Sequence, residues 1–134
     1  MAKRSPRAGE VEARLFVRVI VGKRRFIGPG RADLLEQIDR TGSISAAARA
    51  MRMSYRRAWL HVEDLSQQVG RPLIETAQGG RHGGGAVLTE DGRALLNAYR
   101  RMQRRAGAAV ERELTELLRL TGQRDKRSRG GPGD

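Results

Sequence analysis

The hydrophobic positions at the start of the chain alternate and then change period. Residues 13–21 place apolar side chains, most of them β-branched, at every second position, which predicts a β-strand. The next residues predict a turn and a short second strand at residues 26–27, so a β-hairpin is expected. From Arg31 to Arg40 the apolar spacing becomes three and four, which predicts a helix that ends at Gly42.

Two further helices are predicted after Gly42. Ser45 is expected to cap a short alanine-rich helix, and Ser54 to cap a longer helix that runs to Val69. Apolar residues of the longer helix recur at spacings that predict one buried stripe, namely Ala58, Val62, Leu65 and Val69. Small side chains let the short helix pack closely on the long one: Ala46, Ala47 and Ala50. Two such helices joined by a few residues form a helix-turn-helix.

A second hairpin and a long helix are predicted after the helix-turn-helix. Residues 73–77 and 86–89 have the pattern of short strands, and a glycine-rich segment joins them. Thr89 is expected to cap a helix over residues 90–120, whose first turn holds two acidic residues that suit the helix dipole. The apolar residues of this helix keep spacings of three and four: Leu95, Tyr99, Met102, Ala106, Val110, Leu114 and Leu117.

These elements predict a fold that is mainly α with a small amount of β. The expected domain covers residues 11–121, between a disordered basic arm at residues 1–10 and a disordered basic tail at residues 122–134. It is a winged helix-turn-helix with an N-terminal β-hairpin and a long C-terminal helix. A helix stripe of this length must bury itself against another surface, so we expect a homodimer formed through that helix rather than packing within one monomer.

The charge of the chain narrows the choice of partner. The formal net charge is +12, and +8 of it falls on residues 11–121. A folded body this basic attracts polyanions, since each neutralised phosphate releases condensed counterions. Double-stranded DNA is therefore the expected partner, although a basic surface without a specific partner is the alternative at this point.

Composition also bears on compartment and chemistry. The sequence has no cysteine, which excludes disulfides and thiolate metal sites and fits a cytoplasmic, nucleoid-associated location. It has neither a secretory signal nor an apolar run of membrane-spanning length, so no membrane partner is expected. The two histidines lie in no metal-binding pattern, and Ser54 has no base within reach on its own helix, so we expect neither an enzyme nor a metal or cofactor.

The start of the second helix of the helix-turn-helix carries the predicted DNA chemistry. A major groove about 12 Å wide admits one helix, whose first side chains meet base edges, and arginine can donate two hydrogen bonds to guanine. Glycines between the last two strands would let a loop approach the duplex, as a wing does. A phosphate-cradling nucleotide loop is excluded here, because no Lys-Ser or Lys-Thr pair and no helix follows the glycines. The residues predicted to contact DNA are Ser45, Ser54, Tyr55, Arg56, Arg57, His61, Arg81 and His82.

Two of the neighbouring aromatic residues have competing interpretations. We expect Trp59 to lie in the core and anchor its helix rather than to stack on bases. His61 is expected either to contact a phosphate or to be an ordinary surface residue.

Dimerisation is assigned to six residues of the last helix, namely Leu95, Tyr99, Met102, Val110, Leu114 and Leu117.

Several of these segments together resemble one family. Gly42–Ser45, Met53–Trp59, Pro72–Glu75 and Gly79–Thr89 are similar to the N-terminal domain of ModE-type molybdate-responsive regulators, a LysR-related winged helix of bacteria. The resemblance covers residues 12–120 and implies a DNA-reading helix at residues 54–59, a wing at residues 79–85, and dimerisation through the N-terminal strands and the last helix. The oxyanion-binding domains of that family have no counterpart here, so a stand-alone form without an evident small-molecule effector is expected.

The sequence thus predicts a transcriptional regulator that binds an inverted-repeat operator as a homodimer. Its two recognition helices should lie about one DNA turn, roughly 34 Å, or a multiple of that distance apart. A link to molybdate or related oxyanion metabolism is implied only by the resemblance. The alternative is a nonspecific architectural DNA-binding protein or an RNA-binding protein, although few aromatic residues are present to stack on bases. A third hypothesis is a module that binds another protein through its winged helix.

Overall fold

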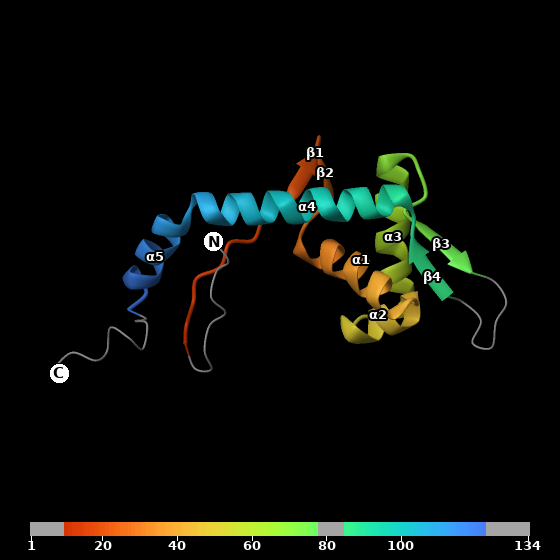
Figure 1. The fold of residues 1–134 in the computed structure, drawn as a ribbon, viewed down its shortest axis with the longest axis horizontal. Coiled ribbons are helices and arrows are strands. Elements are labelled where there is room, and N and C mark those ends of the chain that lie inside the picture. The colour runs from red at the N-terminus through yellow and green to blue at the C-terminus, as the bar shows by residue number, and fades with distance from the viewer. Residues whose placement is uncertain (1–9, 78–84, 123–134) are drawn as a thin grey trace. The chain divides into compact units, whose positions relative to one another are not determined.

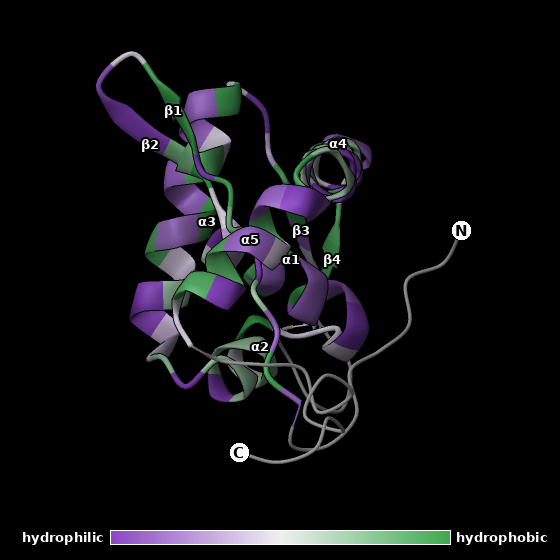
Figure 2. Ribbon diagram, turned by 90° about the vertical axis from the view of Figure 1, so that its left-hand side faces the viewer, coloured by the Kyte–Doolittle hydropathy of each residue, from purple (hydrophilic) through white to green (hydrophobic). Residues whose placement is uncertain are grey.

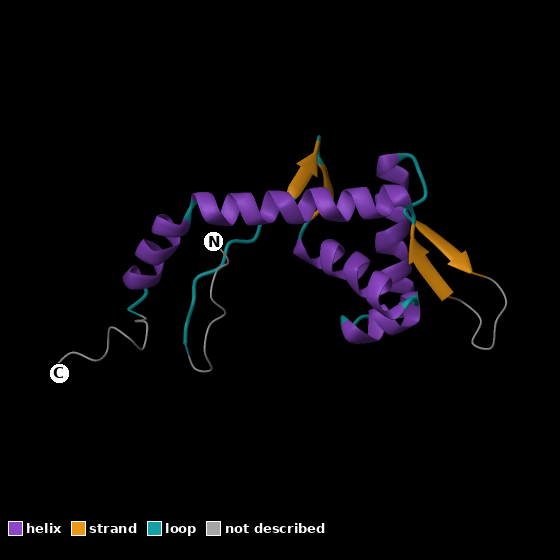
Figure 3. Cartoon of the chain, in the orientation of Figure 1, coloured by secondary structure: helices purple, strands orange, loops and turns teal. Residues whose placement is uncertain are grey.

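The computed structural model describes residues 10–77 and 85–122 (Figure 1). Residues 16–103 form one compact unit, and the remaining described residues belong to a second unit. In the described part of the chain the elements follow in the order β1 (Val19–Val21), β2 (Arg24–Ile27), α1 (Pro29–Thr41), α2 (Ile44–Ala50), α3 (Tyr55–Val69), β3 (Ile74–Ala77), β4 (Gly85–Leu88), α4 (Glu90–Ala109) and α5 (Glu111–Leu120). Helices dominate and the strands form two small hairpins, which confirms the predicted fold class (Figure 3).

The N-terminal hairpin is shorter on one side than predicted. The strand expected over residues 13–21 is confined to β1, because only Val19, Ile20 and Val21 find backbone partners in the four-residue β2. Val19 pairs with Ile27 and Ile20 with Arg25, so the register shifts between them and the pairing is irregular at this end of the hairpin. Alternation of apolar residues alone therefore overestimated this strand, since a strand extends only as far as its partner does.

Local capping signals define the three helices of the helix-turn-helix region. Pro29 occupies the first turn of α1, where its missing N–H costs nothing, and Gly42 ends α1 in the left-handed conformation at φ 72°. Ser43, and not the predicted Ser45, caps α2 by accepting a hydrogen bond from the Ala46 N–H at 3.0 Å. Because α2 already begins at Ile44, Ser45 lies inside the helix and cannot be its cap.

The turn between α2 and α3 is tight and partly strained. Arg52 has φ 56°, a left-handed conformation that residues other than glycine rarely adopt. The Met53 N–H donates to the Ala48 carbonyl at 2.9 Å, which closes the turn. Ser54 then caps α3 by accepting from the Arg57 N–H at 3.1 Å, as predicted, and Gly70 ends the helix at φ 81°. The predicted stripe of α3 is buried except for Val69, which lies exposed at the C-terminal end.

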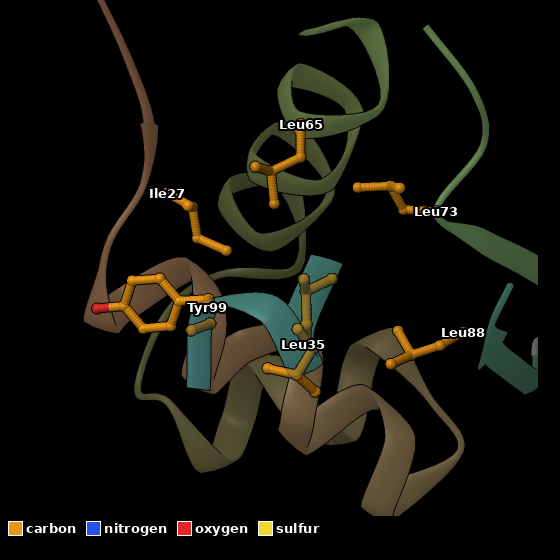
Figure 4. Close-up of a cluster of buried hydrophobic side chains, with 8 residues drawn as sticks. Ile27, Leu35, Leu65, Leu73, Leu88 and Tyr99 are labelled. Atoms are coloured by element: carbon orange, nitrogen blue, oxygen red, sulfur yellow. The ribbon is translucent and has the colours of Figure 1, made fainter. Parts of the chain in front are cut away.

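Two hydrophobic clusters hold the compact unit together, and α1 contributes one of two neighbouring leucines to each cluster. Leu35 contributes to the cluster shown in Figure 4, which joins α1 to β2, α3, the β3–β4 hairpin and α4 and consists of Ile27, Ala32, Leu35, Leu65, Leu73, Leu88, Leu96 and Tyr99. Leu34 belongs to the other, which joins α1 to α2 and α3 and consists of Leu34, Ile38, Ile44, Ala47, Ala48, Ala58, Val62 and Ala86. Full burial of each leucine contributes about 1.5–3 kcal/mol. Within α2, Ala48 takes the buried place that we expected for Ala50.

The second hairpin is tied to the end of α1 through β4 and is closed at its own base. β3 and β4 pair in an antiparallel register from Ile74–Leu88 to Ala77–Gly85. The Ala86 N–H donates to the Gly42 carbonyl at 2.7 Å, and the Thr89 N–H donates to the Leu73 carbonyl at 2.9 Å. The hairpin therefore has a defined direction relative to α1, although its tip, residues 78–84, lies outside the described residues.

The long C-terminal helix is interrupted. Thr89 caps α4 through its hydroxyl, which accepts from the Gly92 N–H at 3.1 Å, as predicted. The single helix expected over residues 90–120 is wrong, however, because α4 ends at Ala109 and α5 begins at Glu111. Val110 has φ −116° and ψ 20°, and its N–H bonds to the Gly107 carbonyl three residues back. Gly107 lowers helix propensity before the break, and Glu111 and Glu113 favour a new helix start after it.

None of the helices in the described ranges is both long enough and apolar enough to cross a membrane.

Candidate nucleic-acid interface

The first turn of α3 presents its side chains to solvent. The cap at Ser54 fixes where the helix starts, and Tyr55, Arg56 and Arg57 follow it, all three exposed. Hydrophobic and hydrophilic residues alternate as bands along the helix (Figure 2). Because Ala58 and Val62 anchor the same turns in the core, the exposed residues are held on a rigid element.

Positive charge is concentrated around this turn. Residues 40–62 contain five arginines and no acidic residue. Among the described residues, Arg49, Arg52, Arg56 and Arg57 form no ion pair. The start of α3 is therefore electropositive, without a carboxylate within residues 40–62 to cancel the field.

The acidic residues of α1 are occupied elsewhere. Asp39 pairs with Arg93 of α4 at 3.1 Å, and Asp33 pairs with Arg100 of α4 at 2.7 Å. Arg100 also lies 3.5 Å from Glu36. These pairs neutralise charge between α1 and α4 and leave the arginines of α2 and α3 in excess.

Arg56 and Arg57 differ in where they lie on α3. Successive helix residues are about 100° apart. Arg57 and His61 line a pocket together with β2 and the start of α1, whereas Trp59 and Glu63 line a second pocket with β3. The two hairpins thus flank α3 on different sides (Figure 1). Arg56 lines neither pocket and occupies the outward face between them.

Trp59 is not the core anchor that the sequence suggested. Its side chain is 44% exposed and lines the open pocket of about 460 Å³ beside β3. The helix is anchored instead by Ala58, Val62 and Leu65, which leave no buried position for residue 59. The tryptophan is therefore available to a partner that approaches α3 from the wing side.

His61 is half-buried and hydrogen-bonded within the protein. Its Nδ1 accepts from the Arg31 Nε–H at 3.1 Å, and Arg31 in turn lies 2.7 Å from the Asp64 carboxylate. Burial, together with the positive charges of Arg31 and Arg57, lowers the pKa of His61. The imidazole is thus neutral at neutral pH with its hydrogen on Nε2, so any phosphate contact would use that single N–H donor.

The remaining predicted DNA-contacting residues divide between described and undescribed parts of the chain. Ser45 lies exposed in the first turn of α2. Arg81 and His82 fall on the wing tip, outside the described residues. The strands that carry the tip, β3 and β4, are in place next to α3.

The six residues assigned to dimerisation also separate into groups. Tyr99 is 2% exposed in the core of its own unit, and its hydroxyl donates to the Val17 carbonyl at 2.7 Å, so we do not retain it as an interface residue. Burial accordingly raises the pKa of Tyr99. Leu95 packs against the same core. Met102 and Leu117 are exposed, while Val110 and Leu114 are half-buried.

Comparison with known proteins identifies the helix-turn-helix. Residues 31–93 match the family model "Bacterial regulatory helix-turn-helix protein, lysR family". Residues 31–93 are a LysR-type helix-turn-helix domain. This is a transcription-factor domain of a non-enzymatic family, in agreement with the expectation from the sequence.

The relatives of the LysR-type domain are regulators and molybdenum-related proteins. The chain is 46% identical over 92 residues to the molybdenum-pterin-binding protein MopB of Rhodobacter capsulatus, covering 69% of this chain and 31% of MopB. It is 42% identical over 79 residues to the transcriptional regulator ModE of Haemophilus influenzae, covering 59% of this chain and 31% of ModE. The chain thus spans about a third of the length of these relatives.

Solved structures agree on the fold of the LysR-type domain. The DNA-binding domain of CbnR in complex with DNA superposes with a TM-score of 0.52 at 24% identity, over 65% of this chain and 94% of that one. Full-length LysG of Corynebacterium glutamicum gives a TM-score of 0.51 at 28% identity, over 69% of this chain and 29% of LysG.

The arginines beside the start of α1 could not be predicted as a group from the sequence. Arg18, Arg25 and Arg31 come together with Arg57 only through the hairpin and the packing of α1 on α3. No local motif joins them, since they are distributed over forty residues of sequence. The overall excess of arginine is the only feature of the sequence that points to this group.

Proposed function

We propose that this chain is a sequence-specific transcriptional regulator that reads DNA through the start of α3. The observation that carries the proposal is the exposed, arginine-rich and acid-free turn at Arg56, presented by a LysR-type domain. Arg56 on the outward face is assigned to base recognition, because a guanidinium there can donate two hydrogen bonds to guanine. Arg57, on the flank, is assigned to the phosphate backbone.

The further contacts in this proposal come from α2, the wing and the rest of the first turn. Ser54 and Tyr55 face the groove beside Arg56, and Ser45 adds a hydroxyl from α2. Arg81 and His82 of the wing tip are assigned to the backbone or the minor groove. His61 contributes at most its Nε2–H. A protein with this role acts on the chromosome, so we include a cytoplasmic, nucleoid-associated location in the proposal.

We also propose that the regulator is a homodimer. α5 has no buried residue, although Leu114, Leu117 and Leu118 share one of its faces. Within the compact unit, Met102 of α4 is a separate exposed apolar side chain. Sedimentation should show a dimer that Leu117→Glu weakens and Thr115→Glu, on another face of α5, leaves intact. A wild-type protein that sediments as a monomer at all concentrations would refute this part.

Selection from a random pool of DNA duplexes tests sequence specificity. A dimer should enrich an inverted repeat whose half-sites lie one helical turn, about 10 bp, or a multiple of it apart. Recovery of unrelated sequences, with binding that bulk DNA competes away, would instead support the alternative of a nonspecific architectural protein. Retention of RNA in preference to duplex DNA would also contradict the proposal.

The relatives suggest what such a regulator controls. They include a molybdenum transport protein of Azotobacter vinelandii and the molybdenum-pterin-binding proteins of Rhodobacter capsulatus. We propose a link to molybdate or a related metal oxyanion on this basis. Selected sites that lie upstream of oxyanion-transport or molybdenum-cofactor genes would support the link, and sites without any such neighbours would contradict it.

A further inference from the structure

A basic pocket lies on the flank of α3 that faces the N-terminal hairpin. Its volume is about 300 Å³, at the lower end of the range for small-ligand sites. The walls come from the residue before β1, from β2, the start of α1, the turn before α3, and α3 itself. Four arginines line the pocket, namely Arg18, Arg25, Arg31 and Arg57. No acidic residue is part of the lining. Arg18 and Arg25 precede the matched LysR-type domain, so nothing in that match assigns them a role.

One of these arginines is structural and the other three are available. Arg31 pairs at 2.7 Å with Asp64, which it shares with Arg24, and donates to the Phe26 carbonyl at 2.9 Å and to His61, so its guanidinium is committed to partners within the protein. Arg18, Arg25 and Arg57 are exposed, and none of them forms an ion pair in the described ranges. The pocket therefore carries an excess of positive charge that no neighbouring carboxylate neutralises.

The pocket also offers neutral donors. Gly28 precedes α1 without a capping side chain, so the first-turn amides of Gly30 and Arg31 lack a side-chain acceptor. A Cβ at Gly28 would lie 3.4 Å from both Cγ and Nε of Arg18, which shows that the Arg18 side chain passes directly over this helix start. His61 Nε2–H adds a further donor to the same lining. Guanidinium groups, helix amides and a neutral imidazole N–H all favour an anion with several oxygen acceptors.

The position of the pocket relates it to DNA. Arg57 belongs both to the first turn of α3 and to the pocket lining. A helix inserted in a major groove has one sugar-phosphate backbone on each side. The β3–β4 hairpin lies on one flank of α3, and this pocket lies on the other.

We propose that this pocket is a phosphate-oxyanion site formed by Arg18, Arg25 and Arg57 together with the start of α1. Its ligand is either a backbone phosphate of the bound duplex or a free phosphate-type anion. Binding of a backbone phosphate of the duplex rests on the proposed function, whereas binding of a free anion does not.

A salt titration of DNA binding tests the backbone source. Each phosphate contact contributes about 0.9 to the slope of log K against log salt concentration. The Arg25→Gln variant should therefore lower the slope by about one unit relative to wild type. Lys23→Gln removes one charge from the same hairpin outside the pocket and serves as the matched control, for which the slope should stay unchanged. Both side chains are exposed, so neither variant should alter folding.

A titration with inorganic phosphate, followed by NMR of the free protein at constant ionic strength, tests the other source. Saturable shifts of the Gly30 and Arg31 amides in wild type and in Lys23→Gln, but not in Arg25→Gln, would establish the site even if the DNA slope is unaffected. If the two variants behave alike in both titrations, the proposal is wrong. A wild-type protein without affinity for DNA would remove the proposed function, while the phosphate titration alone would still decide whether the pocket binds anions.

Discussion

Gly92 is the position where a single added methyl group should be most damaging. A Cβ built on Gly92 would lie 2.2 Å from the Leu73 carbonyl oxygen and 3.1 Å from the Leu73 carbonyl carbon. The backbone must therefore move before an alanine side chain can be accommodated at position 92. Leu73 is fully buried, and its carbonyl accepts the Thr89 N–H at 2.9 Å. Overpacking costs about 1–3 kcal/mol and the weakened hydrogen bond about 0.5–1.5 kcal/mol, so Gly92→Ala should lose about 2–4 kcal/mol of unfolding free energy.

Gly107 provides the control within the same helix. A Cβ at Gly107 meets nothing within 4 Å, so Gly107→Ala should gain up to about 1 kcal/mol from helix propensity. Chemical denaturation of both variants, followed by circular dichroism, measures the difference. If Gly92→Ala is as stable as wild type, the close packing of α4 on the backbone of Leu73, just before β3, is incorrect.

Three further contacts are each tested by substitution. Ser54→Ala should cost about 0.5–2 kcal/mol of unfolding free energy through loss of the α3 cap, whereas Ser45→Ala, which removes no cap, should stay within about 0.5 kcal/mol; equal losses would contradict the assigned caps. Tyr99→Phe should lose about 1–3 kcal/mol in denaturant titrations, because the Val17 carbonyl is left without its donor, and no loss would disprove that bond. The pKa of His61 is lowered in the folded protein, so as the pH drops below 6.5 the unfolded state takes up the proton more readily and the free energy of unfolding should fall. His61→Gln should reduce this pH dependence of stability. A profile of stability against pH that is unchanged in the variant would contradict the lowered pKa.

Sequence reasoning succeeded where a short segment determines its own structure. Ser54 caps α3 and Thr89 caps α4, and Gly42 and Gly70 end their helices in the left-handed conformation, as the residue types predict. The order of helices and hairpins follows from these boundaries together with the apolar spacing.

The errors concern either partners distant in sequence or local preferences too weak to give a clear signal. β1 is short because β2 offers few residues to pair with, and apolar alternation carries no information on that limit. Trp59 is exposed because the small Ala58 faces the core in its place. The interruption at Val110 depends on several weak local preferences rather than on one strong signal such as proline. The pocket around Arg18 and Arg25 exists only after the hairpin packs beside α3.

The central claim is that Arg56 at the exposed start of α3 reads a base. Fluorescence anisotropy with the selected duplex and with a scrambled duplex, for wild type, Arg56→Ala and Lys23→Ala, tests it directly. Arg56→Ala should weaken binding to the selected duplex by about 1–3 kcal/mol, or about 5- to 150-fold, with a much smaller effect on the scrambled one. Lys23→Ala should leave the preference between the two duplexes intact. Equal weakening of both duplexes by Arg56→Ala, or no weakening of either, would contradict the claim.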